Sequence, residues 1–600
     1  MELGACPCAG IPEPVRVPRA LPEGGGCCMG VGALGGRAKC HLAELGFPPV
    51  SAENGLWRVG SVRSRLGNVT VRSADTPGAD VTTEELAQAV CAVMSLYGLR
   101  EGNGPRRVGV DYTSVLRAVS VGQGLLAALL ARARGHALGA VTVDPVSAVL
   151  LPHGHYLAVA EAAPDVFRPR AGQGRPPPFR TLDGQWVEIE TLRADAWGSW
   201  WRHLGVDGVT IGHAWREHAA RQWTGRNRVP EALHAAVAVR SLAELEAAAE
   251  DRGVAVTRLQ PHGRHRPGAL PWTSTAHQPP HGPPPVSGSP APGSLPLSGV
   301  TVVECTRFLQ GPYAGLVLAL LGARVVLVEL PGGDPARGIE PVVNGCFAGF
   351  RSLHRGKHPV RLDITSAPGR RSLLELVSGA DVFLQNWPAG RAERLGLAPG
   401  ALWRVNPHLI CAQASGWAPL RGPRLPTVAT DFSAQAHAGL AYAQRPVGEA
   451  PACSTTTMLD ALGGMVCAEA VLAALLHRET TGRTAAVETS LLSSARLLLS
   501  DPRPSPAPLF HPLPAARGHL ALSDTPRTRA VLGVSSHAGR RELVRALADD
   551  SAAGWEHRLN SLGAACARVR GIGDIADDPA TSRCLQHDQG VRVAAPWEFS

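Results

Sequence analysis

The residue in this sequence best placed to do chemistry is Asp460, within the stretch from Thr455 to Thr489. Polar hydroxyl residues precede it, and Gly463, Gly464 and a long apolar, alanine-rich run follow it. The apolar spacing predicts a buried helix that begins after a hydroxyl-rich turn. We expect backbone N–H groups at such a helix start to stabilise a carboxylate, and the small neighbours to leave room for a ligand. Asp460 could therefore act as a nucleophile; its alternative role is to cap the helix.

The segment ahead of Asp460 alternates buried strands with amphipathic helices. The strand-like runs are LSGVTVVECT, ARVVLVEL, VRLDIT, DVFLQNW and LICAQASGW, and helical runs such as GPYAGLVLALLG separate them. This pattern predicts an α/β fold, an open parallel sheet with helices on both faces. Ligands bind such sheets beyond the carboxyl ends of the strands, where the loops of this chain are rich in Gly, Pro and polar residues.

A proline-rich segment marks the clearest domain boundary. Residues 266–296 are dominated by Pro, Gly, Ser and Ala, which predicts a linker between residues 81–265 and 297–600. Ahead of the linker, Thr82–Leu99 predicts a helix. Asp111–Leu151 predicts a second helical run, VSVGQGLLAALLARARG, followed by a strand-like AVTVDPVSAVLL. FRTLDGQWVEIET predicts a hairpin that turns at Asp-Gly, with helices and a short strand after it.

Three sequence matches in the same order indicate an internal duplication. LAALLHRETTG, starting at Leu472, is echoed by LAALLARARGH, starting at Leu126. FRTLDGQWVEIET has a weaker counterpart in LPAARGHLALSDT, and ELEAAAEDRGVAVTRL pairs with WEHRLNSLGAACARVR. In this alignment Asp460 falls on Ser114, so the early copy lacks the acid. It also lacks a recognisable series of strands, and we expect a degenerate N-terminal copy of the fold.

Composition narrows the class of protein. The chain is 44% hydrophobic and 18% charged, with a net charge of +9 that forms no dense basic tract. This composition favours a globular protein, and the absence of a basic tract argues against nucleic-acid binding. We count no apolar run near the ~20 residues that span a bilayer and no signal-peptide pattern. The expectation is a cytoplasmic protein without a membrane or nucleic-acid partner.

Residues 1–80 are rich in Gly and predict no definite fold. Their cysteines have two interpretations, a zinc site or a poorly ordered leader. The irregular cysteine spacing favours the leader and no metal site. The residues concerned are Cys6, Cys8, Cys27, Cys28, Cys40 and the neighbouring His41.

From Leu297 to about Thr489 the chain closely resembles the family III CoA-transferases, the formyl-CoA and carnitine CoA-transferase group with its 2-methylacyl-CoA racemase relatives. The motifs that carry the resemblance occur in the family's order: LSGVTVVECT, GPYAGLVLALLGARVVLVELPGGDPARG, HRGKHPVRLD, ADVFLQNWPAGRAERLGL, NPHLICAQASGWAP, TDFSAQAHAGL, MLDALGG and LAALLHRETTG. Residues 100–265 and 500–600 resemble the family's later part more weakly.

The resemblance implies a Rossmann-like CoA-transferase domain in which Asp460 is the nucleophile that attacks an acyl-CoA thioester. A mixed anhydride would form, and exchange with a carboxylic acid would rebuild a thioester. Coenzyme A thioester is then a substrate, and no cofactor is tightly bound. The residues that the resemblance places against CoA are Leu309, Gln310, Leu362, Asp363, Ile364, Thr365, Asn386, Trp387, Pro388 and Arg394.

Two other functions compete with CoA transfer. A racemase of 2-methylacyl-CoA needs an acid–base pair, but Thr430 stands where racemase relatives place a His, before Asp431. A non-catalytic scaffold would keep the fold alone, and the shortened part after residue 500 favours it. The family's chains interlock as dimers. The chain is therefore expected to form a homodimer or, with Pro176–Leu259 as a lid over Asp460, an intrachain pseudo-dimer.

Overall fold

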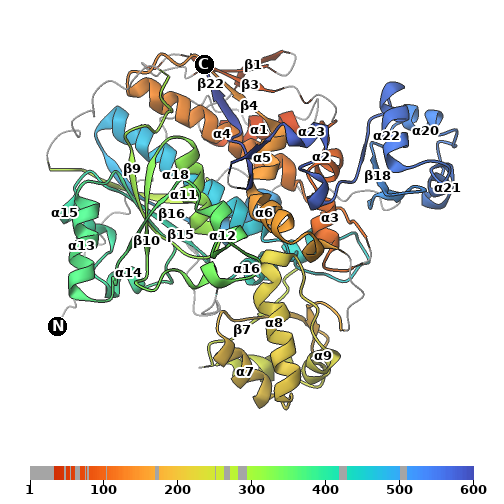
Figure 1. The fold of residues 1–600 in the computed structure, drawn as a ribbon, viewed down its shortest axis with the longest axis horizontal. Helices are drawn as coiled ribbons and strands as arrows, with labels where there is room; N and C mark the ends of the chain where they lie inside the picture. The colour runs from red at the N-terminus through yellow and green to blue at the C-terminus, as the bar shows by residue number, and fades with distance from the viewer. Residues whose placement is uncertain are drawn as a thin grey trace, which may run out of the picture.

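The structure is a computed structural model (Figure 1). It describes residues 33–45, 49–53, 56–60, 66, 68–74, 76, 80–102, 104–168, 174–250, 252–261, 270–280, 293–417, 429–499, 510–588 and 590–600. The predicted cysteine cluster lies mostly outside this set: Cys6, Cys8, Cys27 and Cys28 are not described, and neither is the side chain of Cys40.

A seven-stranded sheet forms the centre of the molecule and confirms the predicted parallel α/β architecture. Its order is β13-β10-β9-β14-β15-β16-β8, parallel except for the last strand. Apolar strand residues such as Val302, Val303 and Phe383 are buried because helices cover both faces. The strands are β9 (Thr301–Cys305), β10 (Arg324–Glu329), β13 (His358–Arg361), β14 (Val382–Gln385), β15 (Ile410–Ser415), β16 (Thr484–Ser490) and β8 (Trp272–His277).

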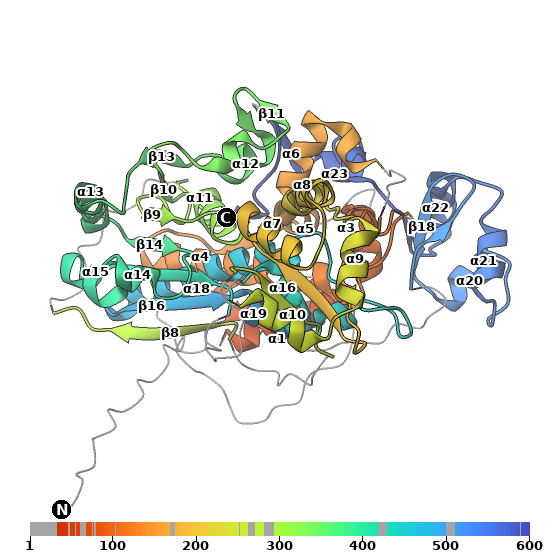
Figure 2. The same ribbon diagram turned by 90° about the horizontal axis from the view of Figure 1, so that it is seen from below.

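Two sets of helices enclose this sheet (Figures 1 and 2). On one face lie α11 (Gln310–Leu320) and α18 (Met458–Thr481), which belong to the largest hydrophobic core. On the other lie α13 (Ala367–Ser378) and α15 (Pro399–Val405), which enclose a separate core. The linker prediction was wrong in one part, because Trp272–His277 is the edge strand β8, paired antiparallel with β16.

The helix α4 (Tyr112–Ala133) packs along α18 and joins the N-terminal half to the sheet domain. The expectation of no apolar segment of membrane-spanning length was wrong, since α4 and α18 are both long and apolar enough. In each helix, 94% of the apolar window is buried inside the protein. Packing of the two helices against each other and their neighbours therefore accounts for their apolar character.

The N-terminal half keeps a small sheet, which the sequence did not reveal. Its order is β1-β2-β3-β4-β22, in which β3 and β4 are parallel. The strands are β1 (Pro49–Glu53), β2 (Leu56–Gly60), β3 (Asn68–Ser73), β4 (Ala140–Val143) and β22 (Trp597–Phe599). The strand-like AVTVDPVSAVLL divides at Asp144, whose side chain caps α5 (Pro145–Leu150).

Part of the region expected to be a leader is folded. The helix α1 (Ala33–Glu44) packs on α4, and the buried His41 Nε2 lies 2.8 Å from Glu469 Oε1 of α18. Burial lowers the pKa of His41, but the charges of Glu469 and Glu44 outweigh it and raise the pKa to about 10. His41 is thus an ion-pair partner of the core rather than a free ligand.

Two lobes of the same topology project from the core (Figure 1). The first has strands β5 (Phe179–Arg180), β6 (Trp186–Glu190) and β7 (Ala255–Arg258), and confirms the hairpin predicted at Asp183-Gly184. The second has strands β17 (Leu513–Pro514), β18 (His519–Leu522) and β19 (Cys566–Arg568) in the same antiparallel order. The helices between the second and third strands are α7 (Ala194–His203), α8 (Gly208–Thr224), α9 (Glu231–Ala238) and α10 (Leu242–Ala249) in the first lobe, and α20 (Pro526–Val531), α21 (Arg540–Ala546) and α22 (Ala552–Ser561) in the second.

Each lobe packs against the other half of the chain. Strands β6 and β7 lie on α16 (Asp431–Ala438), whereas β18 and β19 lie on α2 (Glu84–Val90). Equivalent backbone hydrogen bonds fix both contacts: Gln260 N donates to Ala436 O at 2.9 Å, and Arg570 N donates to Ala89 O at 3.0 Å.

The remaining helices are mostly short. The helix predicted over Thr82–Leu99 is broken into α2 and α3 at Ala92, which has a φ of 61°. The other elements are α3 (Val93–Gly98), α6 (Gly154–Ala162), α12 (Ala348–Leu353), α14 (Arg391–Arg394), α17 (Leu440–Ala443), α19 (Leu491–Leu499), α23 (Pro579–Ser582), β11 (Val342–Val343), β12 (Cys346–Phe347), β20 (Leu585–His587) and β21 (Val591–Val593).

Candidate active site

Asp460 lies in the first turn of α18. It is partly exposed, and its carboxylate makes no hydrogen bond or ion pair with any residue in the described ranges. The hydroxyl-rich turn ahead of it is buried and bonded elsewhere, for example from Thr455 Oγ1 to Gly225 O at 2.6 Å. The side chain of Asp460 is thus the acid at this helix start that is available to a ligand.

Asp431, the first residue of α16, takes the backbone donors at the start of α18. Its Oδ2 accepts hydrogen bonds from Leu459 N at 2.6 Å and from Asp460 N at 2.7 Å. Gln435 Nε2 donates to Oδ1 at 2.5 Å. The expectation that these N–H groups stabilise the charge of Asp460 is therefore wrong; they stabilise Asp431, which caps the helix from outside.

The two carboxyl groups share one electrostatic environment. Burial raises the pKa of Asp460 well above its usual range, and the charge of Asp431 raises it further, while Arg221 lowers it in part. Burial also raises the pKa of Asp431, to about 7, although its hydrogen bonds with Gln435 and the two backbone groups lower it. When only one of the two carboxyl groups is ionised, it is Asp431, because hydrogen-bond donors stabilise its negative charge. Asp460 then keeps its proton.

This pair predicts a pH dependence. A protonated carboxyl group is a poor nucleophile, so kcat/KM should rise with pH as Asp460 loses its proton. Asp431→Asn removes the neighbouring negative charge, which lowers the pKa of Asp460. The acid limb of the kcat/KM profile should therefore shift to lower pH. An acid limb that stays in place would show that Asp431 does not control the ionisation of Asp460.

The first lobe supplies charged side chains to this site. Thr430 Oγ1 donates to Glu190 Oε2 at 2.9 Å, and Glu190 pairs with Arg221 of α8 at 2.5 Å. The Arg221 guanidinium also lies 4.4 Å from the ring centre of Phe432. Tyr156 contributes from α6, where its hydroxyl accepts a hydrogen bond from Thr457 N at 3.3 Å. No local motif in the sequence pointed to Glu190, Arg221 or Tyr156.

Gly463 and Gly464 allow α11 to approach α18 closely. A Cβ on Gly464 would lie 2.4 Å from Gln310 O and 2.5 Å from Tyr313 Cβ. A Cβ on Gly463 would lie 2.9 Å from Gln310 Nε2. The glycines therefore serve helix packing rather than an open reaction space. The contact brings Gln310 within one helical turn of Asp460.

The residues predicted to bind CoA follow the carboxyl ends of three strands. Leu309 and Gln310 come after β9, residues 362–365 after β13, and residues 386–388 after β14. Asn386 joins two of these loops, because its Oδ1 accepts from Arg307 N at 3.0 Å and its Nδ2 donates to Arg307 O at 2.7 Å.

Exposure divides the predicted CoA residues into three groups. The side chains of Leu309, Gln310, Ile364 and Trp387 are buried. Leu362, Asp363 and Asn386 are partly exposed. The exposed members are Thr365, Pro388 and Arg394. Asp363 Oδ1 already accepts from the Thr365 hydroxyl at 2.5 Å.

A second site of the same construction lies in the N-terminal half. Glu84 of α2 accepts hydrogen bonds from Thr113 N at 2.9 Å and Ser114 N at 2.8 Å, at the start of α4. Gln88 Nε2 donates to Glu84 at 2.8 Å, as Gln435 does to Asp431. Ser114 occupies the place of Asp460, and its hydroxyl donates to Glu84 at 2.7 Å. The parallel sequences EELAQA and DFSAQA could have revealed this match.

Comparison with known proteins places the chain in a family. The profile of CoA-transferase family III matches residues 69–265 and 297–504, which together cover more than half of the chain. The chain therefore belongs to CoA-transferase family III.

Its relatives are named as CoA-transferases. The chain is 35% identical over 229 residues to a probable fatty acyl-CoA transferase of Mycobacterium tuberculosis, covering 36% of this chain and 58% of that protein. It is 34% identical to the succinyl-CoA:glutarate CoA-transferase of Mus musculus, covering 33% and 46%. The match thus spans about half the length of these relatives. A crystal structure of the mycobacterial protein gives a TM-score of 0.44 at 28% identity, covering 50% of this chain and 92% of that one.

Proposed function

We propose that this protein transfers CoA between an acyl-CoA and a carboxylic acid, with Asp460 as the nucleophile. The observation that carries the proposal is the pairing of two acids at the start of α18. Asp431 holds the backbone donors, and Asp460 is left partly exposed and without a side-chain partner among the described residues. A carboxylate without a structural role at a helix start is available for covalent chemistry.

The reaction proceeds through exchange of acyl groups on one carboxylate. An Asp460 oxygen attacks the thioester carbon, the C–S bond breaks, and CoA leaves as the thiolate, which leaves a mixed anhydride on the enzyme. Attack of the thiolate on the aspartyl carbon releases the donor acid and forms an aspartyl thioester. The acceptor carboxylate repeats these steps in reverse, so one thioester replaces another and little free energy is lost overall.

Both halves of the chain form this site, which supports an intrachain pseudo-dimer. The first lobe reaches Thr430 through Glu190, and Gly225 accepts from Thr455 in the turn before Asp460. The second lobe covers the equivalent Glu84 site, where Ser114 replaces the nucleophile. We infer a duplicated chain with one active centre, to which the N-terminal half contributes in cis.

The racemase alternative has less support from the geometry. Thr430 caps α16 through its contacts with Ser433 and carries no group that takes up a proton at neutral pH. The acyl donor and acceptor are proposed only as a class, an acyl-CoA and a carboxylic acid.

Covalent trapping tests the nucleophile directly. The full chain is incubated with acyl-CoA, treated with hydroxylamine or borohydride, digested and analysed by mass spectrometry. We expect the modification on the peptide that contains Asp460, and none in Asp460→Asn. Modification of Asp431 instead would reassign the nucleophile, and its absence from both acids with a turning-over substrate would refute the aspartyl mechanism.

A further inference from the structure

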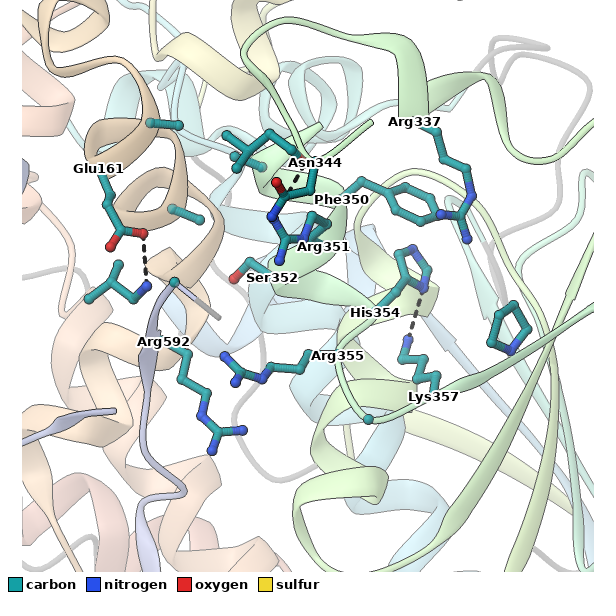
Figure 3. A pocket seen from close by; sticks show the side chains of 18 of the residues that line it. Glu161, Arg337, Asn344, Phe350, Arg351, Ser352, His354, Arg355, Lys357 and Arg592 are labelled. Atoms are coloured by element: carbon teal, nitrogen blue, oxygen red, sulfur yellow. Dashed lines mark hydrogen bonds between the residues drawn. The ribbon is translucent and has the colours of Figure 1, made fainter. Parts of the chain in front are cut away.

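A basic cavity lies apart from the residues of the proposed transfer reaction (Figure 3). Its volume is about 560 Å³, and it is formed between α6, α12 and the loop that enters β21. Arg337, Arg351, Arg355 and Arg592 line it, and Glu161 of α6 lies on the same side as Arg592. Side chains from the N-terminal half, the sheet domain and the last part of the chain thus meet at one place.

Two of the cations in the cavity wall are neutralised by buried acids. Arg337 Nε donates to Glu329 Oε2 at 3.1 Å. Lys357 Nζ donates to Glu304 Oε1 at 2.9 Å and to Pro312 O at 2.8 Å. Burial, together with the charges of Lys357 and Arg337, holds the pKa of the neighbouring His354 well below its usual range. These residues form the floor of the cavity and contribute no net charge.

Arg355 and Arg592 together carry more positive charge than the one carboxylate that pairs with them neutralises. Arg355 and Arg592 share a single carboxylate, Asp588, with Arg592 Nε 2.9 Å from Oδ1. Glu161 Oε2 accepts a hydrogen bond from Val591 N at 2.8 Å. Burial and the charge of Arg355 lower the pKa of Arg592, while Asp588 raises it in part.

The cavity is separate from the predicted CoA residues. None of those residues lines it. Leu327 lines the cavity and belongs to the core beneath α11 and α18. Among the predicted CoA residues, Ile364 and Trp387 belong to the core beneath α13 and α15, on the other face of the sheet, whereas Leu309 shares the core of Leu327. A ligand held by the lining residues alone would therefore not contact the predicted CoA residues.

We propose that this cavity binds a small phosphate-bearing molecule at a site distinct from CoA. Arginine forks match the oxygens of phosphate in pairs, and a phosphate between Arg355 and Arg592 would relieve their repulsion. The volume lies within the ~300–1,000 Å³ of small-molecule sites, which leaves room for more than the phosphate group. Glu161, on the wall formed by α6, would accept hydrogen bonds from hydroxyl groups of the ligand.

Calorimetric titration of the full chain with inorganic phosphate tests the site. The double variant Arg355→Met, Arg592→Met removes both guanidinium groups. The one acid that loses its ion-pair partners is Asp588, which is 58% exposed, so the fold should persist. We expect this variant to bind phosphate about tenfold more weakly than the wild type. Arg394→Met, among the predicted CoA residues, is the matched control and should bind phosphate normally.

A CoA competition experiment separates the two sources of phosphate. Saturating inorganic phosphate should leave the Kd for CoA unchanged, and the double variant should bind CoA normally. Equal phosphate affinity in wild type and double variant, or no phosphate binding by the wild type, would overturn the proposal. Loss of phosphate binding in Arg394→Met, together with competition by CoA, would equally overturn it, because the phosphate would then occupy the CoA site.

Discussion

Asp460→Ala should reduce CoA transfer by about 10⁴-fold or more, the scale of effect seen when a catalytic nucleophile is removed. The structural cost should be small, because the carboxylate of Asp460 makes no hydrogen bond within the described part of the chain. Removing it also removes an unfavourable interaction with Asp431. The thermal midpoint should therefore stay the same or rise, and the Kd for CoA should be nearly unchanged.

The matched control is Asp431→Asn, which alters the neighbouring acid and keeps the nucleophile. It should retain transfer activity, with a shifted pH profile. Asp460→Asn repeats the first test with a side chain of nearly the same shape. Full turnover in either Asp460 variant, measured with an acyl-CoA and acid pair that the wild type uses, would show that another group attacks the thioester.

Residues 297–600 produced alone should be inactive and poorly folded. In the whole chain, α4 covers α18, whose 18-residue apolar window is 94% buried, and removal of α4 would expose that helix. Exposed apolar surface of this extent favours aggregation. The fragment would also lose Glu190 and Arg221, which the first lobe supplies near Asp460.

Co-expression with residues 1–280 should restore a soluble complex with transfer activity. These residues include β8, which completes the central sheet beside β16. The readouts are co-purification, circular dichroism and initial rate. An isolated fragment as active as the full chain would mean that the N-terminal half is an accessory domain and that the cis arrangement is wrong.

The central sheet and the acid at the start of α18 could be predicted because local sequence encodes them. Runs such as TVVEC and RVVLVE are mostly buried and apolar, as expected for strands covered on both faces. Asp460 stands in a continuous motif at a recognisable helix start. In both cases the residues that determine the element lie next to one another in the sequence, so the sequence pattern alone is enough to predict it.

The parts of the site that were missed depend on contacts distant in sequence. Arg221 and Glu190 are 31 residues apart, and Glu190 meets Thr430 across 240 residues. Neither pairing leaves a local pattern. The role of the backbone donors was misassigned for the same reason: they face Asp431, 28 residues before Leu459 along the chain. Sequence periodicity reports which face of an element is buried, but not which partner buries it.

The strand β22 has a consequence for the order in which the protein folds. Trp597 Nε1 donates to Ser120 O at 2.7 Å, a contact that closes a loop of 477 residues, and Phe599 pairs with Val141 of β4. A ribosome therefore releases the whole sheet domain before the strand that seals the edge of β4 is available. Until β22 is made, the edge of β4 has no strand paired with it, and an unpaired strand edge can pair with other chains. The small sheet of the N-terminal half can therefore be completed only after the rest of the chain has been made.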